Sequence, residues 1–120
     1  MALGKDGWIR LVEVVNSSGS PVVPQTDAWA SGVKTVAAPG TAEQLGSLTA
    51  PVGLAIIVKA MSSNEELVFI GNSKANAEGA TTRVSLAAGQ AVVLYIDDSD
   101  LVWVDAVTAG EGVEYFVEQP

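Results

Sequence analysis

The chain has 120 residues and a formal net charge of −8, and it contains neither cysteine nor histidine. This length fits a single domain that can bury a hydrophobic core without disulfides. The missing side chains exclude thiolate chemistry, cysteine zinc sites and the histidine-dependent catalytic triads, so we expect neither an enzyme nor a cofactor. The excess of acidic groups repels phosphate backbones, so we do not expect nucleic-acid binding either.

The chain also lacks the patterns of a targeted or membrane-bound protein. Residues 1–6 show no basic start that leads into an apolar core, so we expect no signal peptide and synthesis in a host cytoplasm. No apolar run approaches the roughly 20 residues that span a bilayer, and we expect no membrane contact.

Residues 1–31 are predicted to form an N-terminal arm and connector. Residues 8–15 are dense in β-branched side chains, which favours a strand over a helix. Residues 16–21 are rich in Gly, Ser and Pro and predict a loop. Residues 20–31 carry two prolines and no clear periodicity, which indicates an extended connector. A large aromatic in that connector, Trp29, is expected to dock on its own domain or on a partner.

The segment from residue 32 to residue 86 contains short apolar runs separated by turn residues. One run, residues 54–61, is apolar on both faces apart from Lys59 and predicts a strand buried from two sides. Residues 73–81 predict an exposed loop with at most one helical turn. The strands expected in this segment cover residues 32–37, 41–45, 54–61, 67–70 and 82–86.

Residues 86–117 hold three apolar runs that Gly and Asp separate at the points of reversal, which predicts an antiparallel meander. Val92, Leu94 and Ile96 are expected on one face, because successive side chains of a strand point to opposite faces. The half of the chain between residues 32 and 86 is expected to supply the opposing layer.

About nine short strands at a spacing of roughly ten residues, with no convincing helix, indicate an all-β fold. We therefore predict a single β-sandwich of jelly-roll type over residues 32–120, preceded by the arm and connector of residues 1–31.

The acidic turn of Asp97, Asp98 and Asp100, with Asp105 on the next predicted strand, is the first candidate site. Clustered carboxylates suit Ca²⁺, which takes about six to eight oxygen ligands, but the run lacks the ligand order of an EF-hand loop. Asp side chains also accept hydrogen bonds from backbone N–H groups in plain hairpin turns. We favour the plain turn and predict no metal site, and ion binding at this turn is left open.

Three glutamates near the C-terminus, Glu111, Glu114 and Glu118, suggest the carboxylate pair of a glycosidase. Glu114 and Glu118 share one face of a predicted strand about 13 Å apart, which is too far for either glycosidase geometry. We therefore interpret these glutamates as a solvated edge. The neighbouring Gly110 and Gly112 precede no helix, so this segment predicts a turn and not a phosphate-binding loop.

The scattered aromatic residues carry the remaining binding signal. Phe116 is predicted to point outward, because Val113, Tyr115 and Val117 claim the inner face of the same strand. An outward Phe suggests contact with a neighbouring subunit or with the N-terminal arm, and the alternative is a half-covered aromatic. The candidate partner-interface residues are Trp8, Ile9, Leu11, Trp29 and Phe116.

About the last 85 residues resemble a family of small virion proteins of tailed bacteriophages, the head decoration or accessory structural proteins. The matching residues are Gly40-Thr41-Ala42-Glu43-Gln44-Leu45, Ile57-Val58-Lys59-Ala60, Asn64, Val68-Phe69-Ile70-Gly71, Leu86-Ala87-Ala88-Gly89-Gln90, Ile96-Asp97-Asp98, Val102-Trp103-Val104-Asp105-Ala106 and Gly110-Glu111-Gly112-Val113-Glu114-Tyr115. The resemblance implies a compact β-sandwich that forms homotrimers on a virion and has no enzymatic residues.

We therefore expect a capsid decoration protein that binds the outer surface of a phage head and contacts the major capsid protein. The first alternative is a tail, neck or fibre module of the virion, because similar modules occur in those parts. The second alternative is a carbohydrate-binding β-sandwich module that uses Trp8, Trp29 or Trp103.

Overall fold

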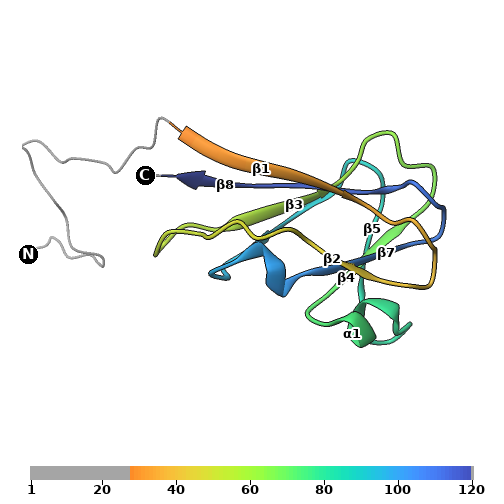
Figure 1. Ribbon diagram of the computed structural model, residues 1–120. Coiled ribbons are helices and arrows are strands. Elements are labelled where there is room, and N and C mark those ends of the chain that lie inside the picture. Colours follow the sequence, from red (N-terminus) through yellow and green to blue (C-terminus); the bar gives the residue numbers. More distant parts are fainter. Residues whose placement is uncertain (1–27, 120) are drawn as a thin grey trace, which may run out of the picture.

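Eight strands, one short helix and one 3-10 turn are formed by residues 28–119, the part of the chain that the computed structural model describes (Figure 1). The helix α1 covers Lys74–Glu78 and the 3-10 turn η1 covers Ser99–Leu101. The strands are β1 (Ala28–Thr35), β2 (Glu43–Gln44), β3 (Ile56–Ala60), β4 (Val68–Gly71), β5 (Val84–Leu86), β6 (Ala91–Leu94), β7 (Trp103–Ala106) and β8 (Gly112–Gln119).

The strands form two antiparallel sheets of four strands each. The order in the first sheet is β1-β8-β3-β6, and the order in the second sheet is β2-β7-β4-β5. The pairs are nested, since β1 pairs with β8, β2 with β7, β3 with β6 and β4 with β5. The described chain is thus one long hairpin folded over itself, and the predicted all-β sandwich is confirmed.

The predicted antiparallel meander of residues 86–117 is wrong. Strands β6 and β8 lie in the first sheet with β3 between them, and β7 lies in the second sheet. The prediction that residues 32–86 supply the opposing layer is wrong for the same reason, because each sheet takes strands from both halves of the chain. Alternating side chains show which face of a strand is buried, but they do not show which strand lies beside it.

The first strand begins earlier than the sequence predicts. Strand β1 begins at Ala28 and not at residue 32, so Trp29 lies in a strand and not in the extended connector. Eight residue pairs with β8, from Ala28 opposite Gln119 to Thr35 opposite Gly112, hold this strand in place. The other residues of the predicted arm, including the strand predicted over residues 8–15, lie outside the described residues.

The core lies between the two sheets and consists mainly of β-branched aliphatic residues. Only one face of β3 is fully buried, because Ile56, Val58 and Ala60 lie in the core while Ile57 and Lys59 are half-buried. The prediction of a strand buried from two sides is therefore wrong, since the second face of β3 belongs to the outer surface of the first sheet. The largest fully buried side chains are Ile56, Val36, Val58, Val68, Val104, Val113 and Val117.

Candidate partner-binding face

The outer surface of the first sheet gathers apolar side chains from all four of its strands. Phe116 on β8 lies opposite Ile57 on β3, and Ile57 lies opposite Val93 on β6. On the other side of β8, the ring of Trp29 packs edge to face on Phe116 with the ring centroids 5.8 Å apart. Trp29 is 67% exposed and Val93 is 52% exposed, so the surface is open to solvent. We call these four residues the open face.

Strand alternation is what turns these residues outward. Val113, Tyr115 and Val117 are buried in the core, so Phe116 between them points away from it, as predicted. The same alternation leaves Val92 and Leu94 packed against the core and exposes Val93. The open face is therefore the outward half of strands whose inward half builds the core.

The charges on and around the open face are mostly acidic. Glu114 and Glu118 are exposed on β8, on the same side as Phe116. Lys59 lies 3.8 Å from Glu114, and this exposed ion pair contributes little to stability because water screens it. An apolar centre with acidic neighbours suits a partner surface that is apolar and carries basic groups.

The basic side chains of the described residues are already engaged. Lys34 lies 3.3 Å from Glu43, Lys59 pairs with Glu114, and Lys74 lies 2.6 Å from Glu78. The guanidinium of Arg83 lies 3.5 Å from the ring centroid of Phe69. Within residues 28–119, the basic groups thus neutralise acidic neighbours or cover a ring and do not form a separate positive surface.

The outer surface of the second sheet is covered, in contrast to the open face. Helix α1 contacts β4 and β7 there, and Figure 1 shows it on the side of that sheet away from the first sheet. Phe69 on β4 is only 6% exposed and lies under Arg83. Asp105 beside it is 3% exposed and accepts a 2.9 Å hydrogen bond from the backbone N–H of Gly40.

Two local features hold α1 in this position. A Cβ atom on Gly71 would lie 2.5 Å from the backbone nitrogen of Ala77, so only glycine lets the helix approach β4 this closely. The carboxylate of Glu78 accepts hydrogen bonds from the backbone N–H of Ala42 at 2.8 Å and from Lys74 at 2.6 Å. These bonds lower the pKa of Glu78, with the bond from Lys74 as the largest cause.

The acidic turn is a structural corner of the fold. Asp98 caps η1 by accepting a 2.9 Å hydrogen bond from the backbone N–H of Asp100, and it also accepts a 2.7 Å bond from the Ser47 hydroxyl. These bonds lower the pKa of Asp98, the backbone bond most strongly. Burial and the nearby negative charge of Asp98 raise the pKa of Asp100. Asp98 makes the predicted bond to local backbone, but the turn is not the predicted hairpin, because β6 and β7 lie in different sheets.

Ser99 ties this corner to the loop that follows β2. Its side chain is fully buried, and its hydroxyl accepts a 2.7 Å hydrogen bond from the backbone N–H of Leu48 and donates to the carbonyl of Gly46. The backbone N–H of Ser99 donates to the carbonyl of Leu48 at 3.0 Å. The sequence did not predict this role of Ser99, because the three aspartates around it do not indicate a buried side chain.

The C-terminal glutamates have separate surroundings. Glu111 is half-buried, and its carboxylate accepts exposed hydrogen bonds from the backbone N–H groups of Glu65 at 2.7 Å and Glu66 at 3.1 Å. Glu114 and Glu118 are exposed, as predicted. Within residues 28–119, no group of three or more acidic side chains is arranged to hold a metal ion, and no helix is long and apolar enough to cross a membrane.

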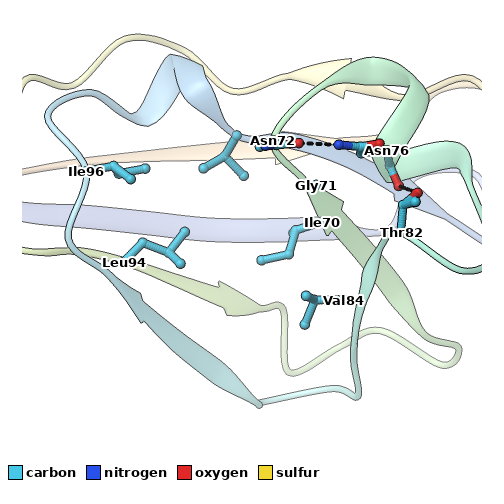
Figure 2. A pocket seen from close by; sticks show the side chains of 9 residues that line it. Ile70, Gly71, Asn72, Asn76, Thr82, Val84, Leu94 and Ile96 are labelled. Atoms are coloured by element: carbon cyan, nitrogen blue, oxygen red, sulfur yellow. Dashed lines mark hydrogen bonds between the residues drawn. The ribbon is translucent and has the colours of Figure 1, made fainter.

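An apolar cavity of about 470 Å³ opens between the sheets on the side of β5 and β6. Figure 2 shows Ile70, Val84, Leu94 and Ile96 around it, with polar residues at one end. Those polar groups already have partners, since the Asn76 amide donates to Asn72 and the Thr82 hydroxyl donates to the Asn76 carbonyl. On the opposite side of the sandwich, Lys34 on β1 and Glu43 on β2 form an ion pair between the two sheets.

The structure brings together two of the five predicted interface residues. Trp29 and Phe116 are in contact on the open face, whereas Trp8, Ile9 and Leu11 lie outside the described residues. The sequence prediction did not include Ile57 and Val93, which need the strand register before they can be assigned to this face. Trp103 is half-buried on the second sheet, so Trp29 and Trp103 do not form one binding surface.

The fold and the open face define a class, an all-β sandwich with one covered sheet and one uncovered sheet. The chain matches no protein-family model, no curated protein and no solved structure. The resemblance to phage decoration proteins therefore stays a prediction.

Proposed function

We propose that this chain is a structural protein of a phage virion, which binds the outer surface of the head as a homotrimer and stabilises the joints between major capsid subunits. The observation that carries the proposal is the open face, where the exposed Trp29 packs on the half-buried Phe116 beside Ile57 and Val93. The resemblance of the last 85 or so residues to decoration proteins supports the same function.

The open face has the physical character of a docking surface. Gathered exposed apolar side chains on a small domain mark interaction sites more often than isolated ones do. Aromatic residues also dominate the binding energy at the centre of many interfaces, because they exclude water over a large area. Each copy buries a modest area, and many copies on one shell together resist the pressure inside the head.

The topology supports a narrower description of the fold within this proposal. Eight strands in two sheets with nested pairing are the arrangement of a jelly roll, in which a long hairpin wraps into a sandwich. Jelly rolls are common among viral capsid domains. We therefore propose the jelly-roll type for this domain.

Co-sedimentation with capsids that lack the protein tests the proposed function. The unmodified chain is expected to pellet with the capsids, and the double variant Trp29→Ala, Phe116→Ala is expected to stay in the supernatant. Leu101→Ala is the control, because Leu101 is also exposed and apolar but lies outside the open face. Binding of the double variant at the level of the unmodified chain would contradict the proposal.

Imaging of particles that carry a labelled copy tests the location. A decoration protein gives signal over the whole shell. Signal at a single vertex would overturn the head location in favour of a tail, neck or fibre module. Binding to a glycan panel, lost in Trp29→Ala, would instead favour the carbohydrate-binding alternative.

The predicted arm is tested by a deletion of residues 1–27, which leaves β1 complete. The arm is expected to lie along a neighbouring subunit, so the truncated protein should stay folded and lose capsid association. Full capsid binding by the truncated protein would remove the arm from the proposal and leave the open face as the binding surface.

A further inference from the structure

Four strands form the edges of the two sheets, and they differ greatly in length. Strand β1 has eight residues, whereas β6 has four, β5 has three and β2 has two. A free edge presents unpaired N–H and C=O groups that can accept another strand, and a very short edge strand limits such pairing. Among the described residues, only β1 offers a long edge.

The edge of β1 has only one of the usual protections against pairing, a charged side chain. It contains no proline, and its register with β8 runs over eight consecutive pairs without a bulge. Its only charged side chain, Lys34, pairs with Glu43 of the other sheet. Two of its apolar side chains remain open to solvent, since Trp29 is 67% exposed and Val33 is 60% exposed.

We propose that residues 8–15 of a second copy of this chain pair along the free edge of β1 as an additional strand, so that copies are joined by strand exchange. These residues number eight, as β1 does, and both segments are about 27 Å long when extended. Six of the eight are Val, Ile, Leu or Trp, which suits a strand beside Trp29 and Val33.

The connector is the reason that the donated strand comes from another copy. Twelve residues, 16–27, separate the donor segment from β1, and they include Pro21 and Pro24. Each proline fixes its own φ and disfavours helical backbone in the residue before it, so the sequence predicts an extended connector here. An extended connector carries the donor segment away from the edge of its own copy. Head-to-tail donation then closes a ring, as the proposed homotrimer requires.

The molar mass of the purified protein, measured by light scattering, tests the strand exchange. The full chain is expected to have three times the mass of one chain, and the protein without residues 1–27 is expected to be a single chain. Every residue of the core cluster lies between residues 30 and 117, so the truncated protein keeps its core, and circular dichroism checks its fold. A single-chain mass for the full protein, or an unchanged mass after truncation, would overturn the proposal.

Point variants in the full chain give the same test without truncation. Leu11→Pro and Val12→Pro remove neighbouring N–H groups that point to opposite sides of a strand, so at least one of them removes a ladder hydrogen bond. That variant is expected to lower the mass to one chain, whereas the control Ser18→Pro in the connector keeps the trimer. Full mass in both Leu11→Pro and Val12→Pro would overturn the proposal.

Two further measurements distinguish strand exchange between copies from strand pairing within one copy and from capsid binding. Protection of β1 amides from hydrogen exchange in a single-chain protein would place the added strand on its own copy and overturn the exchange. The inference rests on the homotrimer of the proposed function, but the mass of the purified protein is measured without capsids and does not depend on capsid binding. Phe116→Ala lies on β8, away from the edge, so it is expected to weaken capsid binding and leave the mass unchanged.

Discussion

The two sheets have the same number of strands and share one core, but their outer surfaces differ. The second sheet is covered by α1 and by the loop at Gly40, and its Phe69 is 6% exposed. The first sheet carries Trp29 at 67% exposure, and its Phe116 is half-buried against that ring. The chain therefore covers the outer surface of one sheet itself and leaves the outer surface of the other sheet open to solvent.

The covered outer surface of the second sheet shows what is missing from the outer surface of the first sheet. Both outer surfaces contain a Phe on an inner strand of the sheet, so composition alone does not distinguish them. The difference lies in the cover, because Gly71 and Glu78 attach α1 to the second sheet by close approach and hydrogen bonds. The first two predictions below test this difference and the next two test the corner at η1, from the largest expected effect to the smallest.

The two phenylalanines of the chain provide a matched pair. Phe69→Ala removes a buried ring and is expected to lower the free energy of unfolding by about 3–5 kcal/mol. Phe116→Ala loses less buried area and one aromatic contact, so a loss of about 1 kcal/mol is expected. Urea denaturation of both variants measures the difference. Equal losses would show that the two outer surfaces are equally covered and would contradict the comparison.

Gly71→Ala tests the cover directly. The new Cβ would meet the backbone of α1 at 2.5 Å, so the helix must shift, and we expect a loss of about 1–3 kcal/mol in the free energy of unfolding. Ser85→Ala is the control, because Ser85 is exposed on β5 in the same sheet and should change stability by less than about 0.5 kcal/mol. An unchanged unfolding midpoint for Gly71→Ala would show that α1 is not held against β4.

Ser99→Ala tests the corner that joins η1 to the loop after β2. The substitution leaves the partly buried N–H of Leu48 and carbonyl of Gly46 without this hydroxyl, which is expected to cost about 1–3 kcal/mol. The control is Ser62→Ala in an exposed turn, where no measurable change is expected. A neutral Ser99→Ala would mean that other groups hold the corner.

Acid should weaken the fold through the carboxylates that accept backbone hydrogen bonds. The pKa of Asp98 is lowered by the bond from Asp100, and the pKa of Glu43 is lowered chiefly by the bond from the Ala37 N–H. A lowered pKa gives stability that is present above the unfolded pKa of about 4 and is lost as the pH falls through the folded value. Asp100 acts in the opposite direction, because its pKa is raised.

The unfolding temperature of the unmodified chain and of Asp98→Asn, measured from pH 6 to pH 2, checks this prediction. The variant should be less stable near neutral pH, and the gap between the two proteins should narrow in acid, where Asp98 becomes neutral. A gap that stays constant over this range would show that the charge of Asp98 does not support the corner.

Much of the local structure could be predicted from the sequence, because it depends on local patterns. Turn residues and alternating side chains predicted strands within residues 86–117 and the outward direction of Phe116. Gly89, at the reversal between β5 and β6, has a positive φ of 81°. These features follow from neighbouring residues alone.

The pairing of the strands could not be predicted in the same way. Phe116 meets Trp29 because the two ends of the described chain pair, and no local pattern encodes a contact across such a distance in sequence. The same is true of Asn64, whose amide donates a 2.8 Å hydrogen bond to the carbonyl of Gly112. The composition of the open face depends on this register, so only Trp29 and Phe116 could be named in advance.

Hydroxyl-radical footprinting of the protein on assembled particles tests the central claim, that the open face of the first sheet meets the partner. Oxidation of Trp29 and Phe116 is expected to fall strongly on the particle relative to the free protein, while oxidation of Trp103 on the second sheet stays the same. Protection of Trp103 with Trp29 and Phe116 still reactive would contradict the account.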